Sequence, residues 1–113
     1  MFFVSDGTMR YTYAYSSRDG AHDSKLLSRG KWICEAVLWV TNWEHLGQLE
    51  TEDDRVVLLA LLSPSFGKVI HQFPNAHSEA TIYAQQFLKQ LNDLPEQFME
   101  TFHVPKEHTG EYI

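Results

Sequence analysis

The residues best placed to do chemistry lie between Gly30 and Leu49. A glycine turn leads into a short extended piece, and Glu35 then opens one or two helical turns over 35–40. The first backbone N–H groups of a helix have no intrahelical partner and carry the positive end of the peptide dipoles, so they attract an anion such as a phosphate. A carboxylate in the same turn accepts hydrogen bonds from sugar hydroxyl groups. The stretch 30–49 therefore predicts a site that holds both parts of a nucleotide.

The order of residue types in this stretch resembles the phosphate-binding cassette of cyclic-nucleotide-binding domains. That cassette reads Phe-Gly-Glu-x-Ala-Leu and, after a short gap, Arg-Ala. Here Trp32 precedes the run 35–38 (EAVL), and Gly47 stands where the cassette has its second small residue. The spacing is most similar to the variant in channel-like proteins of some protists. The resemblance covers about residues 1–92.

The resemblance assigns roles to individual residues. It implies that Glu35 accepts a hydrogen bond from the ribose 2′-hydroxyl group, and that the backbone N–H groups of Ala36 and Val37 face the cyclic phosphate. The arginine that pairs with the phosphate in the family is replaced by Leu46, with Gly47 as the small residue after it. A leucine side chain cannot pair with an anion, so this position departs from the family pattern.

His45 is the nearest substitute for the missing arginine. A histidine is mostly neutral at neutral pH, whereas an arginine offers a permanent charge and a bidentate fork. In the family, a residue of the last helix often covers the purine base. The resemblance offers Tyr83 or Phe87, in the predicted helix 75–91, for this contact, and Phe87 is assigned instead to the helix core. We therefore expect the ligand, cAMP or cGMP, to bind weakly or not at all.

Other chemistries have weaker signals in the sequence. The six histidines show no HExxH or clustered metal-ligand spacing, and the single cysteine, Cys34, lies among apolar neighbours. A metal-dependent barrel enzyme of the cupin type would need more histidines on adjacent strands than His22 and His45. No Ser/His/Asp or Cys/His arrangement is indicated either. We expect no enzymatic activity, no catalytic residues, no metal and no cofactor.

Length and charge limit the class of protein. A chain of 113 residues forms one domain, and its net charge of −6 argues against a general nucleic-acid-binding role. The longest apolar run, residues 56–62, is too short to cross a membrane, and the first residues do not resemble a signal peptide. We expect a cytoplasmic protein, or the cytosolic part of a membrane channel, with no membrane insertion by this chain.

The pattern of strands followed by helices predicts a mainly β protein with carboxyl-terminal helices (α+β). The fold class expected from the resemblance is the partial jelly-roll, the β-roll of cyclic-nucleotide-binding domains, over residues 1–92, with a short helix and a frayed tail over 93–113. Asp6-Gly7 predicts a type I′ hairpin. The expected elements are strands at 2–5, 8–15, 25–27, 48–52 and 55–62, the last buried on both faces, and helices at 63–73, 75–91 and 96–102.

Family members normally carry a helix and two further strands before this point, so the roll is expected to be amino-terminally truncated. Either Met1 begins a fragment, or the roll has an exposed edge that needs a partner. Two functions follow. The first is a regulatory module that couples a cyclic nucleotide to an effector such as an ion channel or a kinase. The second is a structural or protein-interaction domain that keeps the roll without the ligand.

Overall fold

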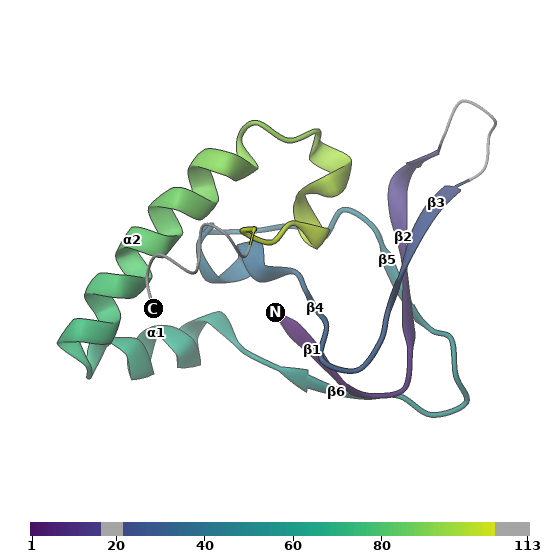
Figure 1. The fold of residues 1–113 in the computed structure, drawn as a ribbon, viewed down its shortest axis with the longest axis horizontal. Helices are drawn as coiled ribbons and strands as arrows, with labels where there is room; N and C mark the ends of the chain where they lie inside the picture. Colours follow the sequence, from purple (N-terminus) through teal and green to yellow (C-terminus); the bar gives the residue numbers. More distant parts are fainter. Residues whose placement is uncertain (17–21, 106–113) are drawn as a thin grey trace.

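The computed structural model describes residues 1–16 and 22–105 of the chain. It is a small mixed α+β protein with two three-stranded antiparallel sheets, two α-helices and two 3₁₀ turns (Figure 1). The α+β class is thus confirmed. The elements are β1 (Phe2–Asp6), β2 (Met9–Ser16), β3 (His22–Leu27), β4 (Trp32–Ile33), η1 (Glu35–Leu38), β5 (Gln48–Thr51), β6 (Val57–Ala60), α1 (Ser63–His71), α2 (Pro74–Leu91) and η2 (Glu96–Thr101).

The Asp6-Gly7 turn moves the chain from one sheet to the other, so the predicted hairpin is wrong. β1 pairs with β4 and β6, whereas β2 pairs with β3 and β5. Gly7 has a φ of 82°, but Asp6 is not at positive φ, as a type I′ turn would require. A Cβ on Gly7 would lie 2.6 Å from the carbonyl oxygen of Arg55. The glycine therefore permits a close approach between the β1–β2 connection and the β5–β6 connection, each of which passes from one sheet to the other.

The strand β6 lies at the edge of its sheet, which corrects the expectation of a strand buried on both faces. The sheet order is β4-β1-β6, and the side chain of Leu59 is 59% exposed. Leu62, just after the strand, is 62% exposed. The apolar run was long enough for a central strand, but its burial depends on neighbours that the run itself does not specify.

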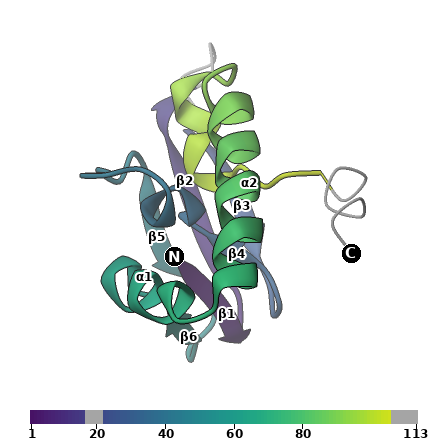
Figure 2. The ribbon, with the colours of Figure 1, turned by 90° about the vertical axis from the view of Figure 1, so that its left-hand side faces the viewer.

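The two α-helices lie to one side of the sheets (Figure 1, Figure 2). Each begins with a proline in its first turn, where the missing N–H group costs no hydrogen bond. Their N-caps are Leu62 and Phe73, and neither helix has a side-chain cap hydrogen bond, although Ser63 and Asn75 are residue types that often cap helices. Within the described residues, no helix is both long and apolar enough to span a bilayer.

Among the residues that the structure describes, two hydrophobic clusters make up the core, and η1 connects them. Cys34 belongs to the cluster between the sheets, and Ala36 belongs to the cluster beneath α2. The second cluster also contains Phe87, Leu91 and Val104. The sequence predicted fraying from about this point, but Val104 is only 7% exposed. The segment around η2 is therefore packed into the protein. The rest of the expected frayed tail, residues 106–113, lies outside the described residues.

We predict that Phe87→Ala lowers the free energy of unfolding by about 3 to 5 kcal/mol, as expected for a large side chain removed from a close-packed core. Phe87 has 0% exposure in the second cluster. Ile82→Ala on the same helix is the matched control, since Ile82 is 50% exposed. Its loss should stay below about 1 kcal/mol. Urea unfolding measures both values, and equal losses would contradict the position of the core.

Candidate functional site

The carboxylate of Glu100 forms the centre of the candidate site. Glu100 lies on η2, and its side chain is only 1% exposed. Its Oε1 atom accepts hydrogen bonds from the hydroxyl group of Tyr11 at 3.0 Å and from the backbone N–H of Gly47 at 3.0 Å. The backbone N–H of Leu46 donates to the same oxygen. One carboxylate oxygen is thus held by donors from β2 and from the segment that enters β5.

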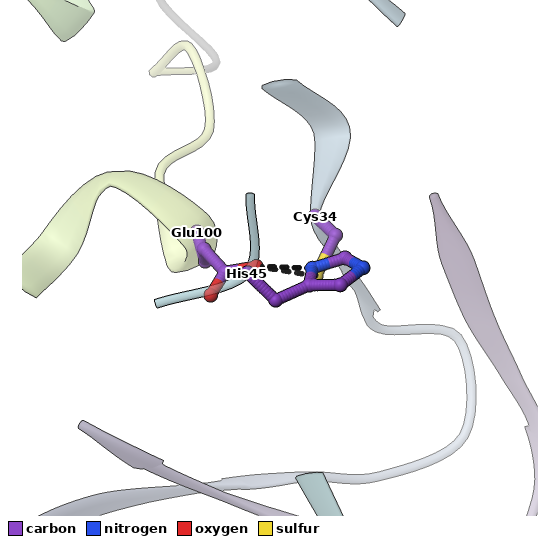
Figure 3. Close-up of side chains that lie close together, drawn as sticks. All are labelled: Cys34, His45 and Glu100. Carbon is purple, nitrogen blue, oxygen red and sulfur yellow. Dashed lines mark hydrogen bonds and ion pairs between the residues drawn. The ribbon is translucent and has the colours of Figure 1, made fainter. Parts of the chain in front are cut away.

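The second oxygen, Oε2, faces two side chains with different chemistry. The thiol of Cys34 donates to it at 3.1 Å, and Nδ1 of His45 lies 2.7 Å away (Figure 3). The sulfur of Cys34 and Nδ1 of His45 are 3.6 Å apart. The side chain of His45 is 55% exposed, whereas those of Cys34 and Glu100 are buried. The two oxygens of the carboxylate therefore have different partners. Oε1 accepts from a phenol and two backbone N–H groups, whereas Oε2 faces a thiol and an imidazole.

Backbone geometry places these groups. Cys34 has a φ of 65°, a left-handed conformation that few residues other than glycine adopt, and its N–H donates to the carbonyl oxygen of Glu100 at 2.9 Å. Gly47 packs directly against Tyr11, where an added Cβ would lie 2.4 Å from the phenol oxygen. Only a residue without a side chain lets the Tyr11 hydroxyl and the Gly47 N–H reach the same carboxylate oxygen.

The hydrogen bonds decide the charge of Glu100. Burial opposes ionisation, but the bonds from His45, from Cys34 and from the two backbone N–H groups outweigh it, and they hold the pKa of Glu100 below its usual value. Burial, together with the nearby carboxylate, raises the pKa of the Cys34 thiol and of the Tyr11 hydroxyl. At neutral pH the site thus combines a buried negative charge with a neutral thiol and a neutral phenol.

Glu35, the predicted sugar contact, lies in a separate hydrogen-bond network inside the protein. It is 4% exposed and accepts hydrogen bonds from the indole N–H groups of Trp32 at 3.0 Å and Trp39 at 3.3 Å. The hydroxyl group of Tyr83, the predicted base contact, donates to Glu35 at 2.7 Å. Burial, followed by this hydrogen bond to Glu35, raises the pKa of Tyr83. A ribose hydroxyl group would have to displace one of these internal donors.

The two residues after Glu35 are occupied by packing and by a backbone hydrogen bond. Ala36 has 0% exposure in the cluster beneath α2, and the N–H of Val37 donates to the carbonyl oxygen of Cys34 at 3.4 Å. The helix η1 that carries them has only four residues. The structure therefore brings His45, Leu46 and Gly47 together around an anion, but it does not bring Glu35 or Ala36 into hydrogen bonds with that anion.

Sequence reasoning missed three residues of this site: Glu100, Tyr11 and Cys34. Glu100 falls in the predicted helix 96–102 outside the roll, Tyr11 falls in the predicted strand 8–15, and Cys34 lies among apolar neighbours in the sequence, so no local pattern gives any of them a role. One signal for Glu100 was present. It is a single acidic residue within the run 98–102 (FMETF), and a charge in an apolar setting needs internal partners.

A cavity of about 280 Å³ opens beside the carboxylate. Its walls include the apolar side chains of Phe2 and Leu49 together with the polar groups already described. The residues that line the cavity are Phe2, Tyr11, Cys34, His45, Gly47, Leu49 and Glu100. The site therefore has space for a small molecule or an additional ligand next to the thiol, the imidazole and the carboxylate.

Comparison of the chain with known protein families, with curated proteins and with solved structures found no match.

The lowered pKa of Glu100 predicts a specific acid dependence of stability. Its charged form is favoured by the fold, so it contributes stability above the unfolded pKa, about 4.3 for glutamate, and loses it as pH falls through the lower folded value. Glu100→Gln removes this titration. The difference in unfolding free energy between the wild type and Glu100→Gln should be constant above about pH 5 and shrink toward pH 3.

Urea unfolding between about pH 3 and pH 7 measures this difference. Glu79→Gln, at an exposed position on α2, is the matched control and should leave the pH dependence of the wild type unchanged. A difference for Glu100→Gln that keeps the same size down to pH 3 would show that the fold does not favour the carboxylate.

Proposed function

We propose that this chain is a non-catalytic regulatory module built like a cyclic-nucleotide-binding domain, in which its own Glu100 occupies the anion position. The fold in this proposal is the partial jelly-roll β-roll of that family. One observation carries it. The backbone N–H groups of Leu46 and Gly47, with His45 beside them, hold a carboxylate in the segment where the resemblance places the arginine that pairs with the phosphate.

Because Glu100 occupies the anion position, a ligand can bind there only by displacing the Glu100 carboxylate. A cyclic phosphate and a carboxylate each carry a negative charge, and two such charges in one buried site repel strongly. Because Ala36 is buried and the N–H of Val37 is already bonded, the phosphate in this proposal uses the N–H groups of Leu46 and Gly47 and competes with Glu100 for them. A cyclic nucleotide can therefore enter the anion position only when Glu100 leaves it, and that movement carries η2 away from β2 and β4. In this proposal, the moving carboxyl-terminal segment passes the signal to an effector such as an ion channel or a kinase in the cytoplasm.

The internal partners of Glu35 favour weak binding of a cyclic nucleotide to the resting protein. Three donors must be given up or rearranged before Glu35 can bind a sugar. Because each hydrogen bond to a charged group contributes about 1.5 to 3 kcal/mol, this exchange uses much of the binding energy that a small ligand provides. Leu46 in the place of the family arginine removes a further source of affinity.

A second function is favoured by the same two carboxylates, since both have a full set of internal donors. In this alternative, Glu35 and Glu100 are permanent structural groups, and the chain is a protein-interaction domain that binds no nucleotide. The two proposals differ in one respect that can be measured. Only in the regulatory module does removal of the Glu100 carboxylate create a site for an anion.

The test is a titration with cAMP and cGMP, followed by tryptophan fluorescence, with 5′-AMP as the ligand control and EDTA present. The wild type should show no saturable change below about 1 mM. Glu100→Ala frees the N–H groups of Leu46 and Gly47 and removes a like charge, so cyclic nucleotides should bind at least about tenfold more tightly than to the wild type. Glu79→Ala, on the exposed side of α2, should behave like the wild type.

Circular dichroism establishes that Glu100→Ala is folded. A folded variant that binds no cyclic nucleotide would overturn the regulatory module and favour the interaction domain. Wild-type protein that binds as tightly as Glu100→Ala would show that Glu100 does not occupy the anion position.

A further inference from the structure

Three side chains with metal-binding atoms converge beside the cavity. The Sγ atom of Cys34, Nδ1 of His45 and Oε2 of Glu100 all lie within 4.8 Å of one another. They come from the end of β4, from the segment before β5 and from η2, so their sequence spacing forms no known motif (Figure 3). In the part of the chain that the structure describes, no other three histidine, cysteine or acidic residues come together in this way.

We propose that Cys34, His45 and Glu100 bind a Zn²⁺ ion. The donor types select the metal, because a thiolate, an imidazole and a carboxylate are all regular zinc ligands, whereas Mg²⁺ and Ca²⁺ prefer oxygen ligands throughout. This inference goes beyond the proposed function and does not depend on it, since the metal would bind the arrangement that the structure shows, with Glu100 in place.

The distances fit a site that needs only a small adjustment. Tetrahedral zinc with ordinary bond lengths separates these ligand atoms by about 3.3 to 3.6 Å. The sulfur of Cys34 and Nδ1 of His45 are already 3.6 Å apart. The distances from Oε2 of Glu100 are shorter, 2.7 Å to His45 and 3.1 Å to Cys34, as expected for direct hydrogen bonds. The distance to His45 must lengthen by about 0.6 Å, and the half-exposed His45 ring can supply this movement. The distance to Cys34 must lengthen by about half an ångström, which takes a small movement of the Cys34 or Glu100 side chain.

The other oxygen of Glu100 is already held by the protein. Tyr11 donates to Oε1 at 3.0 Å, and the N–H groups of Leu46 and Gly47 donate to the same atom. Partners of this kind orient a metal-binding carboxylate and fix which oxygen faces the ion. The carboxylate would therefore bind zinc through Oε2 alone, without losing the hydrogen bonds made by Oε1.

The charges balance when zinc binds. The ion replaces the thiol proton of Cys34, which passes to the solvent, so the site combines Zn²⁺ with one thiolate, one carboxylate and a neutral imidazole. The net charge of this group is zero, which favours its burial. The three protein ligands leave a fourth position that faces the cavity of about 280 Å³, where a water molecule or a small ligand can complete the tetrahedron.

The test uses metal ions alone, added to the full chain after treatment with EDTA and a non-thiol reductant. One Co²⁺ per chain should give visible bands of tetrahedral cobalt and a near-ultraviolet thiolate-to-cobalt charge-transfer band. One equivalent of Zn²⁺ should abolish both and raise the thermal midpoint by several degrees. Octahedral cobalt without the charge-transfer band, or no binding in the micromolar range, would overturn the proposal.

His45→Gln is the informative variant, because His45 is 55% exposed and its replacement leaves the core intact. It should weaken Zn²⁺ binding by at least about tenfold and lose the thermal shift. Cys34→Ser should lose the charge-transfer band. His71→Gln is the matched control, since His71 stacks on His77 with ring centroids 4.7 Å apart and offers another surface imidazole. Equal losses in His45→Gln and His71→Gln, or a loss in His71→Gln alone, would place the ion elsewhere and overturn the assignment.

Discussion

The structure depends on a buried carboxylate that has its donors inside the protein. Glu100 accepts hydrogen bonds through both oxygens, from two backbone N–H groups and from a phenol, a thiol and an imidazole. An ionised carboxylate without such partners would be very costly to bury, so the groups that surround it must be placed together. This requirement connects η2 with β2, with the end of β4 and with the segment that enters β5. The contacts that attach η2 to the rest of the fold are therefore the same contacts that form the candidate site.

A second buried carboxylate, Glu35, has the same relation to the helical side of the protein. It joins η1 to α2 through Tyr83 and holds two tryptophan side chains. The residues that resemble a nucleotide-binding cassette are thus largely engaged with one another. In the proposed function this engagement defines the resting state, and in the metal proposal a zinc ion would strengthen it, because the ion bonds Glu100 to Cys34 and His45. In both proposals, the position of the carboxyl-terminal segment depends on the side chain of Glu100.

Local signals in the sequence predicted much of the secondary structure. Pro64 near the start of the first helix, Pro74 as the break between the two helices and the break before Glu96 placed α1, α2 and η2 close to their observed bounds. Strand pairing was less predictable: Asp6-Gly7 does form a turn, but the choice of sheet on each side depends on tertiary contacts. Glu100 was missed for a similar reason. It lies 66 positions from Cys34 in the sequence, and no local pattern indicates which donors will surround it.

The most direct test of this account is the titration of Glu100 by carboxyl ¹³C NMR, with Glu100→Gln used to assign the resonance. If the surrounding donors hold the charge, Glu100 titrates below the ordinary glutamate value of about 4.3, and the amide resonances of Leu46 and Gly47 shift with the same midpoint. A midpoint above that value would contradict the account, since it would show a carboxylate destabilised by burial rather than stabilised by its partners. Amide resonances that ignore the titration would contradict it as well, because these two N–H groups form the centre of the proposed anion site.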